Sequence, residues 1–220
     1  MACAPAFRFG LALFLAAACG ALRAEDDDAG QRLYAPCAAC HGPGAQGNRD
    51  LHAPRIAGLP EWYVTRQLRN FRTGLRGAAE DDVYGGQMAR MAEQLWDDGE
   101  VSTLARHVSS LPATSSGRSV RGKASRGETA FAPCAACHGV QAEGNADLGA
   151  PPLAGHDDWY VAEQLQAFRS GLRGAHADDS FGQQMRAAAA LLPDDQALAD
   201  VATYLSTLQN AAGATARQRD

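Results

Sequence analysis

Apolar residues recur at helical spacing in separate stretches of the chain, divided by segments rich in glycine and proline. The first predicted helix covers residues 30–39. A second runs from Pro60 to Gly74, with Leu68 and Phe71 among its apolar positions. Because proline favours the first turn of a helix and glycine favours its end, both boundaries of this second helix are marked.

A further helix is predicted to begin where Asp97 is followed by Glu100. This spacing resembles a capping box, in which two side chains accept hydrogen bonds from the backbone at the start of a helix. Val101, Leu104 and Val108 then fall on one face of that helix. No stretch of useful length alternates apolar and polar residues, so the pattern predicts an all-α fold.

The same pattern is repeated 97 residues later in the chain. The offset stays constant from about Gly30 to Leu111, without a gap. The matched pairs include Cys37 and Cys134, His41 and His138, Trp62 and Trp159, Met88 and Met185, and Asp97 and Asp194. A single duplication explains this match, since two copies are too few for a solenoid.

Two tandem domains follow from the duplication, at residues 25–112 and 125–212. Residues 113–124 between them are small, polar and weakly basic without periodicity, which is typical of a linker. Residues 213–220 are predicted to be a flexible tail. Each copy is short and contains long glycine- and proline-rich loops, so it needs a further group to pack against.

Residues 1–24 are predicted to be a signal peptide that directs export and is then cleaved. Arg8 precedes a short apolar run over residues 11–18, followed by small residues and a group of acids. This run is too short to span a bilayer comfortably. Cleavage after Ala24 would remove Cys19, but three alanines precede this cysteine, so a lipid anchor at Cys19 stays an alternative.

Composition and charge narrow the class of partner. The chain is 46% hydrophobic, and its 20 Lys and Arg against 25 Asp and Glu give a net charge of −5. This balance is ordinary for a globular protein and provides no basic surface for nucleic acid. Residues 29–112 hold nine basic and nine acidic side chains, whereas residues 125–212 hold four and eleven. We therefore expect the two domains to meet different partners, the acidic domain facing a basic surface.

Four of the six cysteines lie in two identical CAACHG strings. The strings contain Cys37, Cys40 and His41 in the first copy, and Cys134, Cys137 and His138 in the second. CxxCH is the attachment site of a c-type haem, because two thiols one helical turn apart can reach two vinyl groups of a porphyrin and the adjacent imidazole can bind iron. A thioredoxin-like pair would need a βαβ context, and zinc would need further soft ligands. The sequence therefore predicts two covalently attached haem c groups.

The second axial ligand of each iron is expected to be a residue that both copies share. Four histidines face other residue types in the opposite copy: His52, His107, His156 and His176. Met88 and Met185 do recur, each 47 residues after its axial histidine. Met91 is the alternative in the first copy, although its counterpart is Ala188. Because His and Met together close the iron, this ligand set favours electron transfer over haem catalysis.

Two further pairs of residues are candidates for contact with the haem. The second ring nitrogen of each axial histidine needs a hydrogen-bond acceptor, and the carbonyls of Pro54 and Pro151 are predicted to supply it. The aromatic pairs Trp62-Tyr63 and Trp159-Tyr160 are predicted either to hydrogen-bond haem propionates while packing against the porphyrin, or to belong to the ordinary core.

At these motifs the chain resembles the dihaem class I cytochromes c, close to the cytochrome c-four family of bacterial periplasmic electron carriers. Supporting motifs are Gly30-x-x-x-Tyr34 and Pro54-Arg55-Ile56-Ala57-Gly58, with their counterparts, and methionines seven residues before Leu95 and Leu192. The resemblance implies two domains packed face to face, each around one haem c, in an electron-transfer protein rather than an enzyme. It implies a periplasmic location and redox partner proteins, namely an upstream electron donor and a terminal oxidase or similar reductase.

Two other functions stay open from the sequence. The chain can be an electron-receiving subunit of a dehydrogenase complex, with membrane association through that partner or a lipid anchor. A dihaem peroxidase is the less favoured alternative, because it requires an iron with an open coordination position.

Overall fold

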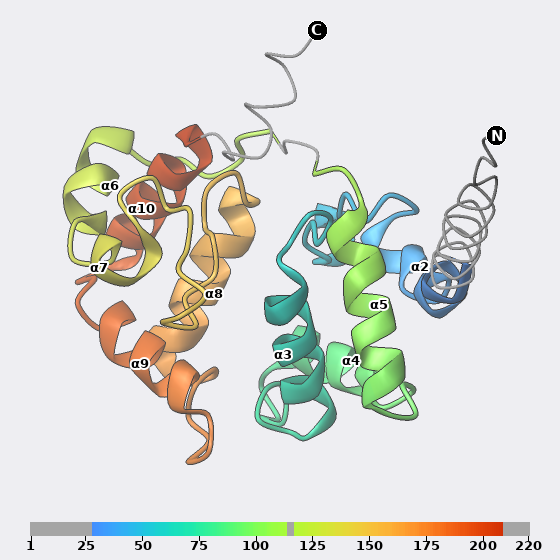
Figure 1. The fold of residues 1–220 in the computed structure, drawn as a ribbon. Coiled ribbons are helices and arrows are strands. Elements are labelled where there is room, and N and C mark those ends of the chain that lie inside the picture. Colours follow the sequence, from blue (N-terminus) through green and yellow to red (C-terminus); the bar gives the residue numbers. More distant parts are fainter. Residues whose placement is uncertain (1–27, 114–116, 209–220) are drawn as a thin grey trace, which may run out of the picture.

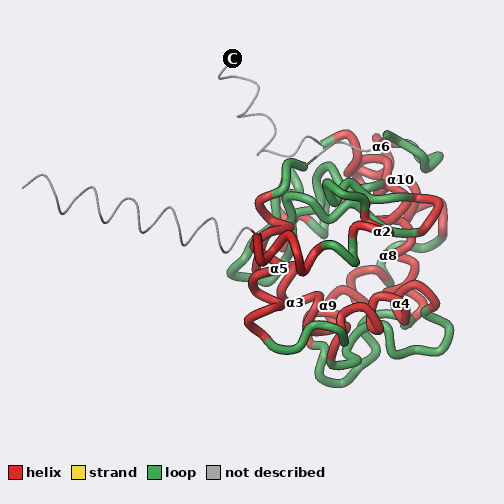
Figure 2. The backbone as a smooth tube through the Cα atoms, turned by 90° about the vertical axis from the view of Figure 1, so that its right-hand side faces the viewer, coloured by secondary structure: helices red, strands yellow, loops and turns green. Residues whose placement is uncertain are grey.

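The computed structural model describes residues 28–113 and 117–208, which form two similar helical halves lying side by side (Figure 1). Within these ranges the backbone is helix and loop without any strand (Figure 2). The only sheet-like pairing there is an isolated bridge in each copy, Asn48 to Ala53 and Asn145 to Ala150. The all-α prediction is confirmed.

Helices of the first half surround a small core of their own. Its elements are a helical segment over 28–34, α2 (Ala38–His41), a 3-10 turn (Arg49–Leu51), α3 (Glu61–Arg72), α4 (Val83–Ala92) and α5 (Asp98–Ser110). The core lies mainly between α3 and α5, where Val64, Val101 and Leu104 are buried.

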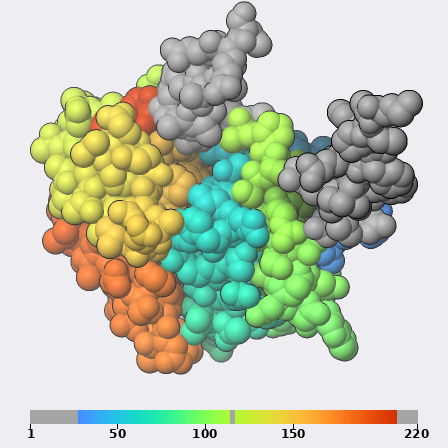
Figure 3. Space-filling view, in the orientation of Figure 1, coloured from blue at the N-terminus to red at the C-terminus, as the bar shows by residue number. Residues whose placement is uncertain are grey.

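The second half repeats this order. Its elements are α6 (Ala124–Phe131), α7 (Ala135–His138), α8 (Asp158–Ser170), α9 (Ser180–Ala189) and α10 (Asp195–Thr207). Val161, Val201 and Leu205 form the corresponding core between α8 and α10. The two halves meet along α3 and α8, and their surfaces abut directly in the space-filling view (Figure 3).

The predicted helix boundaries are mostly confirmed, with one correction. α3 begins after Pro60, and Gly74 follows its end at a positive φ of 75°. The Asp97 side chain accepts a hydrogen bond from the Glu100 N–H at 2.9 Å, as a capping residue does. The predicted helix over 30–39 is broken instead, because Pro36 has no N–H and disfavours helical backbone in the residue before it.

Two helices were not predicted, α4 and α9. Each contains glycine in its first turn, which lowers helix propensity and hides the helical pattern. An aspartate caps each of them: Asp82 accepts from the Gly85 N–H, and Asp179 accepts from the Gly182 N–H, both at 2.9 Å. The repeated aspartates were therefore the indication of these helices that the sequence offered.

The first and last helices of each half cross at close range. A β-carbon added to Gly127 would lie 1.9 Å from the Asp200 carbonyl oxygen, so only glycine allows this approach of α6 to α10. In the first half His107 packs against Tyr34, with ring centroids 5.6 Å apart. Phe131 and Tyr204 make the equivalent contact at 5.7 Å. His107 is therefore a packing residue.

The described part of the linker lies on the second half. The buried Asp158 carboxylate accepts hydrogen bonds from the N–H of Ser119 at 2.7 Å and of Val120 at 2.8 Å. Asp200 accepts from the Lys123 N–H at 2.7 Å. Residues 119–123 are thus fixed to the domain that follows them.

The predicted leader, residues 1–24, and the predicted tail, residues 213–220, lie outside the described residues. Within the described ranges, every helix is too short or too polar to cross a membrane.

Candidate functional site

The histidine of each CAACH string is buried and oriented by a proline carbonyl. His41 Nδ1 lies 2.8 Å from the Pro54 oxygen, and His138 Nδ1 lies 2.8 Å from the Pro151 oxygen. This contact leaves Nε2 of each ring as the atom for a ligand. Burial lowers the pKa of both imidazoles, although the carbonyl contact opposes it. Both rings are therefore held neutral, which is the form that binds metal.

The four cysteines lie at matching positions beside these histidines, and none of them forms a disulfide. Cys37 and Cys134 are partly buried, whereas Cys40 and Cys137 are exposed. Burial raises the pKa of the Cys37 and Cys134 thiols. The two copies thus present the same pattern of one inner and one outer thiol at the start of α2 and α7, which suits attachment of one flat ligand edge.

A cavity of about 590 Å³ adjoins His41 in the first half. Met88 lines this cavity, and Met91 does not. Apolar side chains supply much of the remaining wall: Ile56, Leu59, Val64, Leu68 and Phe71. The volume lies within the usual range for cofactor sites. Part of the wall is apolar, as a porphyrin requires, and polar residues of both halves line the rest, among them Arg76, Gln164 and Arg173.

The second cavity, of about 90 Å³, joins the corresponding residues of the other half. Cys134, His138 and Met185 all line it. Its apolar wall includes Phe131, Leu153, Val161, Leu165, Leu192 and Val201. In both halves, therefore, a CAACH histidine and the repeated methionine face a common apolar space. This donor set fits a c-type haem.

The tryptophans named from the sequence do not line either cavity. Tyr63 and Tyr160, one position later, line both. Adjacent residues of a helix point about 100° apart, so Trp62 and Trp159 face elsewhere. Trp159 is buried in contact with the Tyr160 ring. Of each predicted aromatic pair, the tyrosine is thus the member that lines the cavities, and the burial of Trp159 agrees with the predicted alternative of core packing.

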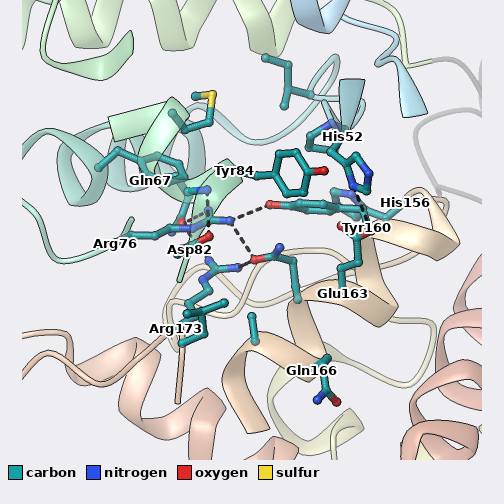
Figure 4. Close-up of a pocket in the computed structure, with 18 of the residues that line it drawn as sticks. His52, Gln67, Arg76, Asp82, Tyr84, His156, Tyr160, Glu163, Gln166 and Arg173 are labelled. Atoms are coloured by element: carbon teal, nitrogen blue, oxygen red, sulfur yellow. Dashed lines mark hydrogen bonds and ion pairs between the residues drawn. The ribbon is translucent and has the colours of Figure 1, made fainter. Parts of the chain in front are cut away.

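Two arginines that the sequence motifs did not identify, the buried Arg76 and the half-buried Arg173, connect the two halves (Figure 4). The Gln67 side-chain oxygen accepts from Arg76 at 2.7 Å and from Arg173 at 2.8 Å. The Gln164 oxygen likewise accepts from Arg76 at 2.9 Å and from Arg173 at 2.7 Å. Arg76 also donates to the Tyr160 hydroxyl at 2.9 Å. Each glutamine therefore bridges one arginine of its own half and one of the other.

Neither of these arginines hydrogen-bonds a carboxylate among the described residues, although the charge of Asp82 acts on Arg76. Each guanidinium packs 4.4 Å from a phenylalanine ring of its own half, Arg76 over Phe71 and Arg173 over Phe168. Their hydrogen-bond partners named above are amide and phenol oxygens. Because a desolvated cation is costly unless an anion hydrogen-bonds it, this cluster suits the carboxylates of a ligand such as haem propionates. The recurrence of arginine in the two Gly-Leu-Arg-Gly strings was the sequence feature that could have identified these residues.

A second set of buried polar residues crosses the same boundary. Arg55, which is 2% exposed, donates to the Gly155 carbonyl at 2.8 Å, and its backbone N–H donates to the Asp157 carboxylate at 2.7 Å. His156 lines both cavities. Burial and the Arg55 charge lower the pKa of His156 to about 4, against the opposing charge of Asp157. His156 is therefore neutral between the two sites at physiological pH.

Comparison with known proteins finds the same family in both halves of the chain. A family model described as cytochrome c matches residues 28–112 and again residues 124–209. The thiosulfate dehydrogenase electron acceptor of Stutzerimonas stutzeri (strain A1501) is 31% identical over 201 residues, which are 81% of this chain and 86% of that protein. Cytochrome c4 of Azotobacter vinelandii is 31% identical over 197 residues, covering 84% and 90%.

A solved structure has the same arrangement of two halves. The crystal structure of reduced recombinant cytochrome c4 from Pseudomonas stutzeri matches with a TM-score of 0.67 and 28% sequence identity. The match covers 83% of this chain and 98% of that one. The similarity to these proteins thus extends over both halves of the chain, and so over both cavities.

Proposed function

Because this chain belongs to the dihaem class I cytochrome c family and is an electron-transfer protein with two covalently attached haem c groups, we propose that each iron is closed by one histidine and one methionine. The proposed ligand pairs are His41 with Met88, and His138 with Met185. The observation that supports them is that each histidine and its methionine line the same cavity, in both copies.

The chain's own residues have distinct tasks at each site. Haem c supplies the iron, which accepts and releases a single electron. Two cysteines would hold the haem covalently, and the Pro54 or Pro151 carbonyl fixes Nδ1 of the imidazole, which would leave Nε2 to bind the iron. The methionine would supply the second protein ligand of the iron, which would leave no position for a substrate and raise the reduction potential. Arg76 and Arg173 would hold propionates at the boundary between the halves.

Substitution of each methionine tests these ligands. Met88→His and Met185→His are each expected to abolish the methionine–iron charge-transfer band of one haem and to lower its reduction potential, since imidazole favours ferric iron more than thioether does. Met91→Leu is the matched control, on the same helix as Met88 and outside the cavity. Retention of both bands in both histidine variants would refute the proposed ligand set.

We propose that the protein is exported through the leader at residues 1–24 and acts in the periplasm. There it would move electrons from an upstream donor to a terminal oxidase or similar reductase. Purification of the mature chain tests this role. A soluble monomer that is reduced by one membrane-extract fraction and oxidised by another is the expected result.

A second role is favoured by one relative. The Stutzerimonas stutzeri protein named as a thiosulfate dehydrogenase electron acceptor is similar over most of this chain. The second candidate is accordingly an electron acceptor dedicated to a dehydrogenase. Co-purification in a fixed ratio with a dehydrogenase, and reduction only in the presence of that enzyme's substrate, would favour this role over a free carrier.

A further inference from the structure

The two methionine helices share a feature that the haem sites alone do not explain. Each has an aromatic residue four positions before its methionine, Tyr84 before Met88 on α4 and Phe181 before Met185 on α9. Residues four apart lie on the same face of a helix, one turn from each other. A contact made by either ring therefore bears on the turn of helix that presents the methionine.

In the first copy the second domain contacts this ring indirectly, through His52 of the first domain. The His52 ring stacks on Tyr84, with centroids 4.1 Å apart and planes at 13° (Figure 4). On its other side, His52 Nδ1 lies 3.2 Å from a carboxylate oxygen of Glu163 on α8. The Trp159 ring, also on α8, meets His52 edge-on at 6.0 Å. The second domain thus reaches α4 through His52.

In the second copy the ring is contacted directly from the first domain. The Arg66 guanidinium on α3 lies 4.4 Å from the centre of the Phe181 ring. Arg66 also donates to the Gly149 carbonyl at 2.7 Å. A β-carbon on Gly149 would lie 2.4 Å from Phe181, so glycine is needed for the ring and the loop to meet. The first domain thus reaches α9 through Arg66.

These two contacts occupy equivalent places in the duplicated chain. At the 97-residue offset, Gly149 corresponds to His52, Phe181 to Tyr84, and Glu163 to Arg66. The residue that reaches across the boundary has therefore changed its charge, while the place of contact is the same. Because the contact across the boundary recurs at equivalent places in both copies, it indicates the same role in each copy.

We infer that each domain positions the axial methionine of the other. Glu163, through His52 and Tyr84, positions the α4 turn that presents Met88, and Arg66, through Phe181, positions the α9 turn that presents Met185. This inference rests on the proposed methionine ligands. Its distinctive consequence is crossed: removal of Arg66 from domain 1 weakens the methionine bond in domain 2, and removal of Glu163 from domain 2 weakens the bond in domain 1.

Imidazole competition in the holoprotein at fixed pH tests the crossed pattern. Imidazole displaces a weakly held methionine, and the axial methionine methyl signals of the two haems in NMR spectra report each site separately. Met88→His and Met185→His identify which signal belongs to which haem.

Arg66→Ala is expected to increase the apparent imidazole affinity of the second haem about three- to tenfold, the range for loss of one cation–π contact. Arg66 also lies 5.0 Å from the Trp62 ring, within its own domain. Arg66→Lys, which keeps a cation over Phe181, is expected to restore most of the methionine bond. Arg69→Ala, one turn further along α3, is the control, since Arg69 pairs with Asp98 of its own domain.

Glu163→Ala is expected to increase the imidazole affinity of the first haem about two- to fivefold, a smaller effect because its side chain is 43% exposed. Glu128→Ala, an exposed acid of the same domain, is the control. Tyr84→Leu should have a similar effect, and the double variant should add little to it, because both residues act through one contact.

The outcomes separate this inference from the proposed ligands. If the wild-type protein has no methionine signals, the ligand proposal fails. If both signals are present but each variant affects its own domain, or both haems equally, the ligands stand and the crossed positioning is refuted. Additive effects of Glu163→Ala and Tyr84→Leu would also refute it, since Glu163 would then act through its charge alone.

Discussion

Arg76 illustrates how the electrostatics of this protein depend on single side chains. It is buried beside the first cavity and reaches Tyr160 and Gln164 of the other half. A positive charge in a partly desolvated position destabilises ferric iron more than ferrous iron, because the ferric centre has one more positive charge. The arginine should therefore raise the reduction potential of the nearer haem.

Replacement of Arg76 by glutamine keeps a hydrogen-bond donor and removes the charge. We expect the potential of the first haem to fall by roughly 50 mV, from Coulomb's law at an effective dielectric near 20. Redox titration of the holoprotein measures this shift. Arg69→Gln, which removes an exposed charge from α3, should leave both potentials unchanged. An unchanged first potential in Arg76→Gln would contradict the assignment.

Some residue-scale features could be predicted from the sequence and others could not. The CAACH strings and the proline carbonyls are local chemistry at fixed spacing, so their geometry was foreseen. Which member of the Trp62-Tyr63 pair faces the cavity could not be predicted, because both are aromatic and only the rotation of α3 decides it. The choice of Met88 over Met91 for the cavity followed from the duplication alone.

At the scale of elements, the crossing of α6 and α10 contains polar contacts of Asp200 that are present in one copy only. Asp200 accepts from the Lys123 N–H and pairs with the Arg126 guanidinium at 2.5 Å, so it fixes both the start of α6 and its first turn to α10. The hydrogen bond from Arg126, with that from Lys123, lowers the pKa of Asp200 to about 2 despite its burial. Thr103 occupies the equivalent position in the first half.

Asp200 should therefore make the second domain sensitive to acid. A carboxyl with a lowered folded pKa stabilises the fold above its ordinary pKa, and this contribution is lost as the pH falls from about 4 towards 2. Asp200→Asn should lower the free energy of unfolding by about 1–2 kcal/mol at neutral pH, allowing for the exposure of Arg126. The same substitution should also reduce the pH dependence of the free energy of unfolding between pH 4 and 2.

Urea unfolding of the holoprotein at a series of pH values measures this effect. Thr103→Asn in the first half is the control and should leave the acid dependence of unfolding unchanged. An Asp200→Asn variant with the full wild-type acid slope would show that another group causes it.

The helices themselves were predictable only where packing and local propensity agree. α3 and α5 have marked ends and a continuous apolar face, so both were found. α4 and α9 hold the proposed methionine ligands on glycine-containing segments, where the tertiary fold and an aspartate cap overcome weak propensity. The break at Pro36 was missed because the helical pattern continues on both sides of it.

At the scale of the whole molecule, the duplication was readable and the contact between the copies was not. The apolar pattern reports which residues are buried within each copy, whereas the boundary is built from Arg76, Arg173, Gln67 and Gln164. Polar residues at such a boundary resemble ordinary surface residues until their partners are known. The shared hydrogen bonds depend on the placement of α3 against α8.

The unequal charge of the two domains gives a prediction at this scale. Residues 125–212 hold four basic and eleven acidic side chains, whereas residues 29–112 are balanced. Electron exchange of the acidic domain with a basic partner should slow steeply as salt rises, while exchange through the first domain should change little. Stopped-flow rates with donor and acceptor at several ionic strengths measure both slopes. Identical slopes would contradict separate docking faces.

The attachment of residues 119–123 to the second domain determines what kind of equilibrium joins the two halves. Only a short stretch of chain spans from the end of α5 to this anchor, so the halves meet at an effective concentration in the millimolar range or above. A boundary made of polar contacts can therefore stay closed in the linked chain at protein concentrations where separate half-molecules would associate far less. The two redox centres thus stay together because one continuous chain links the domains. A single cut in the linker would convert a two-electron carrier into two independent one-electron proteins.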